Sequence, residues 1–351
     1  MAVTLGRSSP LPRVILSSDL GANAVREAHG VGLVQVCRGA FVEPLADAPD
    51  WATAEHLATA RVAAAARRLR SGTTFSHESA ALVHGLWLLH APDVVHVTQR
   101  SKPRRQSAGL RRHTGELAPS DVTEVNGLTV TTVERTIADC AKTMHPRDAL
   151  VVVDSGMRLL LAPRRDQRAL TMQRAEGLRD RVLGLVESGP IHGRRQARAV
   201  VAHADPYAES PYETVIRWIA VSRGLPRPIL QARFQVRGRT YYTDMCWLFE
   251  LPGDGLDFRL RLLGEYDGEL KYLGDAPSAS VTPAATSRRM IDEKRREDDL
   301  RSMPRTSMVR FDRRDVSREE QAFRRLCAVL PAPYVARLEP IPALLGRLAA
   351  Q

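Results

Sequence analysis

Residues 210–330 follow an order of predicted elements that few architectures accommodate: a helix, three strands, a helix, a strand and a closing helix. The first helix begins at Ser210-Pro211-Tyr212-Glu213, where Ser caps the helix, Pro suits its first position and Glu its third. Apolar and β-branched runs at 229–236, 240–249 and 260–272 indicate the three strands. We therefore expect an α/β (α+β) domain with a mixed central sheet.

The upstream part of the chain predicts a separate mixed α/β region. A short helix followed by two extended pieces, with Arg38 at the tip between them, outlines a winged helix-turn-helix. Any small helix-hairpin unit would give the same spacing. The expected organisation is a flexible tail (1–13), a winged-helix-like segment (14–46), a mixed α/β region (47–203), the C-terminal domain (205–330) and a second tail (331–351).

The net charge points to an anionic partner. The 351 residues include 51 Lys and Arg against 40 Asp and Glu, which gives a formal charge of +11. The first 200 residues hold most of the excess, with 27 basic and 19 acidic side chains. Only four of the basic residues are Lys, a bias typical of GC-rich bacterial genomes, so Arg clusters alone are weaker evidence. The excess lies mainly in the N-terminal half, and an anionic molecule is therefore the natural candidate partner.

Several classes of protein are disfavoured by the sequence. The four cysteines lie more than 80 residues apart, so neither a disulfide framework nor a structural zinc site is indicated. No apolar run reaches the roughly 18 residues of a membrane span, and no signal-peptide core is present. Motifs for nucleotide or other small-molecule cofactors are absent from the sequence. We expect a cytoplasmic protein with no membrane partner.

Acidic side chains fall on two neighbouring predicted strands. Asp244 lies in the second strand, and Glu265 and Asp267 lie on one face of the third. If the two strands pair, the carboxylates converge and repel one another, which a divalent cation would relieve. Hard oxygen ligands suit Mg²⁺, which can activate water against a phosphodiester. The alternative is a solvated acidic strand face.

Two further residues could complete such a catalytic site. Glu213 could add a carboxylate from its helix, although a capping role explains it equally well. Lys271, which follows the acidic strand, could orient or deprotonate the attacking water, or could simply screen its acidic neighbours. Lys294, on the next predicted helix, is a second source of an amine, but its spacing from Asp298 is that of an ordinary helix pair.

A basic cluster without acids occupies residues 100–112. Such a predicted loop could contact DNA phosphates, or could be a solvated Arg-rich loop. Its members are Arg100, Lys102, Arg104, Arg105, Arg111 and Arg112. The histidines His77, His84 and His96 are not spaced as a metal set, and we expect them to cap or pack.

The C-terminal motifs resemble a known nuclease fold. The run Glu265-Tyr266-Asp267-Gly268-Glu269-Leu270-Lys271-Tyr272, the helix 293–298 and the Ser-Pro-x-Glu opening at 210–213 are similar to the PD-(D/E)XK fold, in the branch of the very-short-patch-repair endonucleases. That resemblance implies a Mg²⁺-dependent endonuclease or a relic of one. The superfamily pattern places Lys two residues after the acidic strand residue, where this chain has Asp267.

The upstream motifs resemble the antitoxin-like segment of AbiEi-type actinobacterial proteins. They are the segments 75–81, 95–98 and 130–136, and the whole resemblance covers roughly residues 14–330. It implies a DNA-associated regulator with a cognate nucleotidyltransferase-type toxin as partner. The alternatives are an active metal-dependent endonuclease of repair or defence, and a non-catalytic module that binds nucleic acid or protein.

Overall fold

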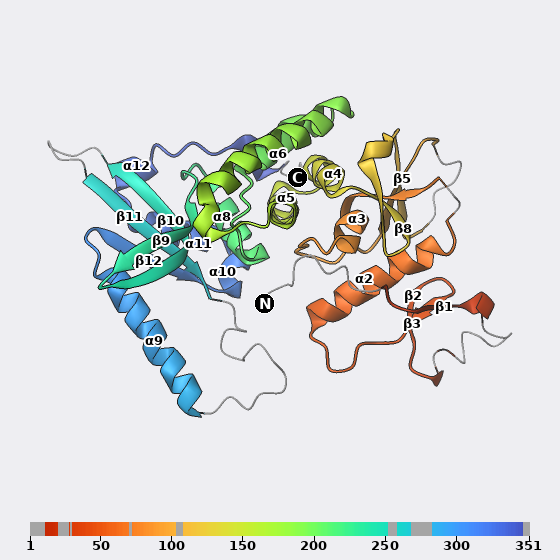
Figure 1. Cartoon of the computed structure of the whole chain (residues 1–351), viewed down its shortest axis with the longest axis horizontal. Helices are drawn as coiled ribbons and strands as arrows, with labels where there is room; N and C mark the ends of the chain where they lie inside the picture. The colour runs from red at the N-terminus through yellow and green to blue at the C-terminus, as the bar shows by residue number, and fades with distance from the viewer. Residues whose placement is uncertain are drawn as a thin grey trace.

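The computed structural model describes residues 11–19, 28, 30–69, 72–102, 108–251, 258–267 and 283–346. Its helices and mixed sheets form an α+β fold, as the sequence predicts. Figure 1 shows one sheet-containing region at each end of the molecule, with a group of helices between them. Of the predicted catalytic and DNA-contacting residues, Lys271, Arg104 and Arg105 lie outside the described residues.

The N-terminal region is a small sheet with one helix against it. Its elements are β1 (Val14–Leu16), η1 (Ser17–Asp19), β2 (Val34–Cys37), β3 (Ala40–Val42) and α2 (Asp50–Ala66). The strand order is β1-β3-β2, and β2 and β3 form an antiparallel hairpin. Gly39 supplies the positive φ of 66° that the tight turn needs, and Arg38 is exposed beside it. The hairpin of the predicted winged helix is therefore present, whereas most of the helix predicted before it falls outside the described residues.

A five-stranded sheet follows, with strand order β6-β5-β4-β8-β7. Its strands and associated helices are β4 (Thr74–Phe75), α3 (His77–Val83), β5 (Val95–Gln99), β6 (Leu110–Thr114), η2 (Pro119–Asp121), β7 (Val122–Val125) and β8 (Leu128–Thr131). The edge strand β6 runs parallel to β5. Arg111 and Arg112 consequently lie on a strand, and the expectation of a continuous basic loop over residues 100–112 was wrong at its C-terminal end.

Helices occupy the centre of the molecule. They are α4 (Val133–Thr143), α5 (Pro146–Leu161), η3 (Arg165–Gln167), α6 (Arg168–Ser188) and α7 (Arg194–His203). Thr132 caps α4 by accepting a hydrogen bond from the backbone N–H of Arg135, and Pro146 begins α5 at the position that suits proline. The fully buried residues of α5, such as Leu150 and Met157, place this helix inside the largest hydrophobic core.

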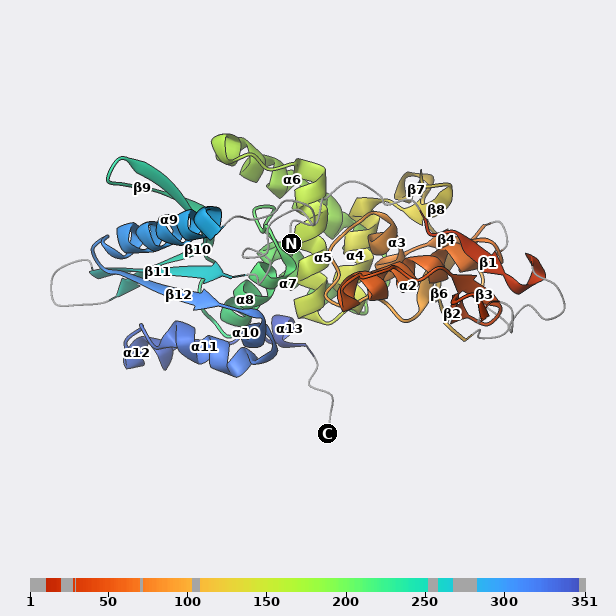
Figure 2. The same cartoon turned by 90° about the horizontal axis from the view of Figure 1, so that it is seen from below.

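The C-terminal region has the predicted order of elements. They are α8 (Pro211–Ser222), β9 (Ile229–Val236), β10 (Arg239–Leu251), β11 (Phe258–Tyr266), α9 (Pro283–Arg301), β12 (Thr306–Phe311), α10 (Arg313–Ser317) and α11 (Glu319–Cys327). The strand order is β12-β11-β10-β9, with β9, β10 and β11 antiparallel and β12 parallel to β11. Figure 2 shows α9 on one side of this mixed sheet and α10 and α11 on the other.

Residues 331–346 are folded, which corrects the expectation of a tail over residues 331–351 for this part, while residues 347–351 lie outside the described residues. The folded part contains α12 (Ala332–Val335) and α13 (Pro342–Leu345). Leu344 is fully buried, and its carbonyl accepts a 2.8 Å hydrogen bond from Nε1 of Trp218 on α8. The apolar residues of this stretch therefore complete the core around α8.

The largest core crosses the expected domain boundary at 203–205. One cluster of buried apolar side chains extends from Ala81 to Leu344 and includes residues of α5 and α8. Asp154 on α5 is fully buried and pairs with Arg217 on α8. The same carboxylate accepts hydrogen bonds from the Thr214 hydroxyl at 2.7 Å and the backbone N–H of Asp205 at 2.8 Å. The two halves of the chain therefore share one core.

None of the helices in the described part of the chain has the length and apolar character of a membrane span.

The buried pair predicts a large loss of stability on mutation. Asp154→Asn leaves the Arg217 guanidinium buried without its counter-ion, which should lower the free energy of unfolding by about 3–5 kcal/mol. Asp166→Asn is the matched control, because Asp166 pairs with Arg164 on the surface, where the pair contributes little. Urea unfolding would measure both. Equal midpoints for the two variants would contradict the role given to Asp154.

Candidate nucleic-acid site on the C-terminal sheet

The acidic residues lie on the face of the sheet opposite its main core. Along β10, Met245, Trp247 and Phe249 point into the core. Asp244 therefore points to the other face, where α9 lies. The register of β10 against β11 pairs Met245 with Gly264 and so places Asp244 beside Glu265. The predicted alternation is confirmed, since Tyr266 belongs to the core.

Glu213 and Asp244 meet at the start of α8. Glu213 is 8% exposed, and its carboxylate accepts hydrogen bonds from the Ser210 hydroxyl at 2.9 Å and the backbone N–H of Glu209 at 3.0 Å. Burial and the neighbouring charge of Asp244 raise the pKa of Glu213 to about 8. Asp244 in turn accepts a 2.9 Å hydrogen bond from the backbone N–H of Tyr266. Glu213 therefore both caps its helix and faces the acidic strand.

Glu265 is held by an arginine of α9. It is 2% exposed, and Nη1 of Arg296 lies 2.6 Å from its Oε2 while Nη2 donates to its Oε1. Nη2 also donates to the carbonyl of Tyr242 on β10 at 2.8 Å. Burial raises the pKa of Glu265 even though Arg296 acts to lower it. The two-pronged contact uses both oxygens that a metal ion would need.

Asp267 has a second arginine partner. Nη1 of Arg310 on β12 lies 3.2 Å from Oδ2 of Asp267. The same guanidinium pairs with Glu293 and lies 3.4 Å from a carboxylate oxygen of Glu297, both on α9. Nearby acids therefore share Arg296 and Arg310 in one ion-pair network.

The fit of this arrangement to Mg²⁺ is poor. Across the described part of the chain, the only set of three or more candidate metal ligands whose atoms lie within 4.8 Å of one another is made of histidines, and it does not include Asp244, Glu265 and Asp267. Arginine partners occupy the carboxylates of Glu265 and Asp267.

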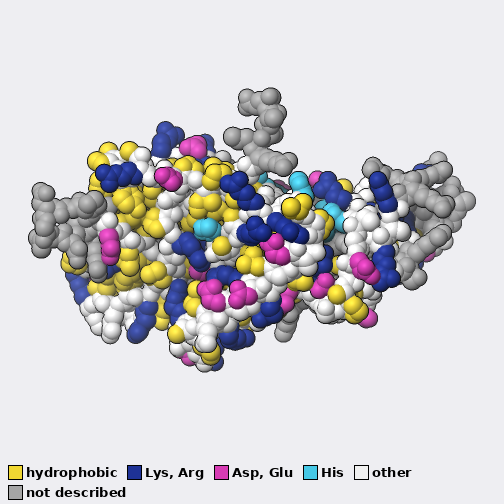
Figure 3. Space-filling model, turned by 90° about the horizontal axis from the view of Figure 1, so that it is seen from above, with side chains coloured by type: hydrophobic (Ala, Val, Ile, Leu, Met, Phe, Trp, Pro, Cys, Tyr) yellow, Lys and Arg dark blue, Asp and Glu magenta, His cyan; other side chains and the backbone are white. Residues whose placement is uncertain are grey.

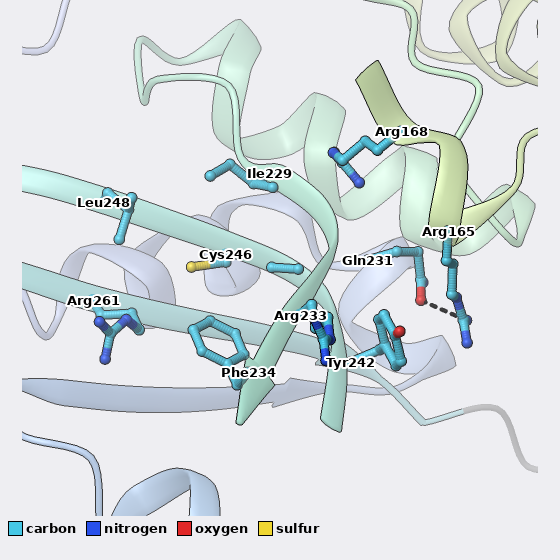
Figure 4. Close-up of a pocket in the computed structure, with 11 residues that line it drawn as sticks. Arg165, Arg168, Ile229, Gln231, Arg233, Phe234, Tyr242, Cys246, Leu248 and Arg261 are labelled. Carbon is cyan, nitrogen blue, oxygen red and sulfur yellow. Dashed lines mark hydrogen bonds between the residues drawn. The ribbon is translucent and has the colours of Figure 1, made fainter. Parts of the chain in front are cut away.

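A basic pocket adjoins the acidic residues on the same face. It has a volume of about 250 Å³ and lies between the beginning of α6 and strands β9, β10 and β11. Figure 4 shows its side chains, with Arg165 reaching toward Gln231 and Tyr242. Its lining includes four arginines and two aromatic residues, Arg165, Arg168, Arg233, Arg261, Phe234 and Tyr242.

Contacts inside the pocket orient the arginines and connect them to the acids. Arg165 lies over the ring of Tyr242 at 4.5 Å and donates to Gln231 at 2.9 Å. Nε2 of Gln231 lies 3.5 Å from Oδ1 of Asp244. Gln231 has a φ of 48°, a conformation that non-glycine residues seldom adopt and that is more common near functional sites. The sequence did not predict the pocket, because its arginines come from three separate segments of the chain, at 165–168, 233 and 261.

The predicted N-terminal DNA contacts that the structure describes lie at the β2–β3 turn and on or beside strands β5 and β6. Arg38 is exposed in the β2–β3 turn, and Lys102 is exposed beyond β5. Arg100 pairs with Glu116 at 3.0 Å, and Arg112 donates to Gln99 at 2.8 Å. Figure 3 shows Lys and Arg distributed over the visible face, with Asp and Glu among them.

The structure brings His77 and His96, which the sequence predicted to cap or pack, together with a third histidine, His113. His77 begins α3, His96 lies on β5 and His113 lies on the neighbouring strand β6. Their candidate ligand atoms all lie within 4.8 Å of one another. The spacing along the chain concealed this group, because the parallel pairing of β5 with β6 was not predicted. His84 stays apart, with Nε2 bonded to the carbonyl of Thr131.

Comparison with known proteins gives little further information. No family model matches the chain, and no curated protein matches it. Among solved structures, the crystal structure of the RV2827C protein from Mycobacterium tuberculosis is similar at 19% sequence identity and a TM-score of 0.29, over 55% of this chain and 77% of that chain.

The pKa of Glu213 predicts a pH-dependent stability. Because this pKa is raised from 4.5 to about 8, the folded chain retains a proton that the unfolded chain releases across that interval. The contribution of Glu213 to the free energy of unfolding should therefore fall as the pH rises through the interval. Glu213→Gln should flatten this fall, whereas the exposed Glu124→Gln should not. Chemical unfolding at a series of pH values measures it, and parallel curves for wild type and Glu213→Gln would refute the prediction.

Proposed function

We propose that the chain is a DNA-associated regulator, of the antitoxin type that its motifs resemble, and that its C-terminal nuclease-like domain binds DNA without cutting it. The observation that carries the proposal is the contact of Arg296 with both carboxylate oxygens of Glu265, beside a pocket lined by four arginines. The guanidinium of Arg296 thus lies beside Glu265 in the place that a metal ion would take. The adjoining pocket suits phosphate groups.

The pocket has the chemistry of a backbone-binding surface. Arginine pairs with phosphate oxygens through two parallel hydrogen bonds, and it is more weakly hydrated than lysine. Arg233 is exposed on β9, where a phosphate can reach it, and Tyr242 and Phe234 are partly exposed nearby. Phosphate contacts of this kind give affinity without reading the base sequence. This surface therefore supports binding of the DNA backbone.

Without a bound metal ion, the acidic side chains of this face would repel the DNA backbone if each carried its full negative charge. Glu213 is protonated at neutral pH according to its pKa of about 8. Arg296 and Arg310 offset the charges of Glu265 and Asp267. The acidic set is thus largely compensated by groups of the chain itself, which supports a binding role that does not depend on Mg²⁺.

A second candidate function is a Mg²⁺-dependent endonuclease. The electrostatic influence of Asp244 on Glu213 favours it, because carboxylates that repel one another are a common feature of cation sites. Under this alternative Arg296 would have to leave Glu265, and Lys271 would be the candidate amine beside the attacking water.

The antitoxin part of the proposal rests on the N-terminal hairpin and on the motif resemblance. Arg38 is exposed at the turn of the hairpin, and this exposure supports a DNA contact there. A nucleotidyltransferase-type toxin is the partner that the resemblance implies. A neighbouring gene for such a toxin, and co-purification of the two products, would support this part of the proposal.

The affinity for duplex DNA should fall as the salt concentration rises, because the pocket arginines contact phosphates. Arg233→Ala should lower affinity for all sequences alike and reduce the slope of log K against log salt by about 1, because one phosphate contact is lost. Arg195→Ala, an exposed arginine on α7, serves as the control. Fluorescence anisotropy of a labelled duplex at several salt concentrations measures the slopes. Identical slopes for wild type and Arg233→Ala would exclude the pocket.

The prediction that the chain does not cleave DNA is tested by adding Mg²⁺ and by replacing Arg296. The wild type should leave supercoiled plasmid intact with Mg²⁺ or Mn²⁺, and neither metal should raise its melting temperature. Arg296→Gln frees the carboxylate of Glu265, so this variant should melt earlier without metal and recover stability with Mg²⁺. Arg295→Gln, on the exposed side of α9, is the control. Cleavage by the wild type that Glu265→Gln abolishes would instead establish the endonuclease.

A further inference from the structure

Three imidazoles from different elements converge in the N-terminal half, on the other side of the molecule's helical centre from the acidic face. Nε2 of His113 lies 3.2 Å from Nδ1 of His96, and the rings of His77 and His113 stack with centroids 3.6 Å apart. A tetrahedral zinc ion with Zn–N bonds of about 2.0–2.1 Å holds its ligand nitrogens about 3.3–3.4 Å apart. The separation of His96 and His113 is thus close to that of two ligands of one ion.

Hydrogen bonding alone leaves this arrangement only partly explained. Nδ1 of His96 faces both Nε2 of His113 at 3.2 Å and Oε2 of Glu78 at 3.1 Å. One N–H can be directed well toward only one of these acceptors. The Ser76 hydroxyl lies 2.9 Å from Nδ1 of His77, and Thr98 donates to that hydroxyl at 2.8 Å. This contact orients the ring and leaves Nε2 of His77 for another partner.

The protonation states suit metal binding. Burial is the main cause that lowers the pKa of His96 to about 3 and that of His113 to about 4, and it lowers that of His77 as well. All three rings are therefore neutral near pH 7, as metal ligands must be. His77 and His96 are 6% and 3% exposed, so a bound ion would be shielded from water on that side.

Backbone strain at His77 is consistent with a site held in place by its surroundings. His77 has a φ of 53°, in the left-handed region. Non-glycine residues in this region are strained and occur preferentially at functional positions.

We propose that His77, His96 and His113 bind one divalent first-row transition metal ion, of the zinc class. Imidazole nitrogen is a ligand that zinc, copper, nickel and iron accept, whereas Mg²⁺ and Ca²⁺ prefer oxygen. Three protein ligands leave one position of a tetrahedral ion open, as in catalytic zinc sites. The site belongs to a different sheet from the acidic residues and does not depend on the proposed function.

Two neighbouring charged residues, Glu78 and Arg111, should change the affinity for zinc in opposite directions. The carboxylate of Glu78 lies 3.1 Å from Nδ1 of His96, the nitrogen that would bind the ion, so its negative charge should favour a bound cation. Arg111 lies two residues before His113 on β6, and its charge acts on all three histidines. Glu78→Gln should therefore weaken the affinity for zinc several-fold, and Arg111→Gln should strengthen it.

The experiment uses the full chain, stripped with a chelator and titrated with Zn²⁺ against a competing zinc indicator. We expect one tightly bound zinc per chain, a rise in melting temperature with zinc, and loss of both in His113→Asn. His90→Asn, at an exposed histidine outside the group, should bind as the wild type does. Equal zinc binding by the wild type and His113→Asn, or no tight binding by the wild type, would overturn the proposal.

A second variant covers the case in which His113→Asn fails to fold. His113→Cys keeps a metal-binding side chain on β6, so it should retain one bound ion. With Co²⁺ in place of zinc, this variant should gain a thiolate-to-cobalt charge-transfer absorption that the wild type lacks. A folded His113→Cys protein without this absorption would show that residue 113 does not reach the ion and would equally overturn the proposal.

Discussion

The buried ion pair between Asp154 and Arg217 joins the two halves of the molecule. Both side chains lie inside the largest core, where an unpaired charge would be strongly destabilising. The carboxylate also accepts hydrogen bonds from Thr214 and from the backbone at Asp205, so it fixes the start of α8 as well as its middle. The position of α8 then decides where Glu213 meets Asp244. A contact far from the sheet thus sets the geometry of the acidic face.

Charge compensation within the chain is the second organising feature. In the C-terminal sheet, Arg296 and Arg310 neutralise the carboxylates of Glu265 and Asp267, which the sequence predicted as ligands of a metal ion. In the N-terminal sheet, burial keeps the three histidines neutral. The two groups thus differ in the ligand chemistry they favour: phosphate beside the arginines, and a transition metal between the imidazoles.

Patterns local in sequence were read correctly. Ser210-Pro211 begins α8 because capping preferences act within one helical turn. The alternation that places Glu265 opposite Tyr266 follows from the period of a strand. Features that depend on packing between distant segments could not be predicted from the sequence. The contact of Arg296 with Glu265 requires α9 to cross the sheet at one position, and the histidine group requires the parallel pairing of β5 with β6. The docking of Leu344 on α8 is of the same kind, since no local pattern predicts a partner 126 residues away.

The claim that the acidic face of the C-terminal sheet binds DNA is tested most directly by photo-crosslinking. The full chain would be irradiated with a duplex containing 5-iodouracil, and the adducts would be mapped by mass spectrometry. The account predicts adducts at Tyr242 or Phe234 in the arginine-lined pocket, with the DNA recovered uncut in Mg²⁺. Adducts confined to the N-terminal hairpin around Arg38, with none on β9 or β10, would contradict it.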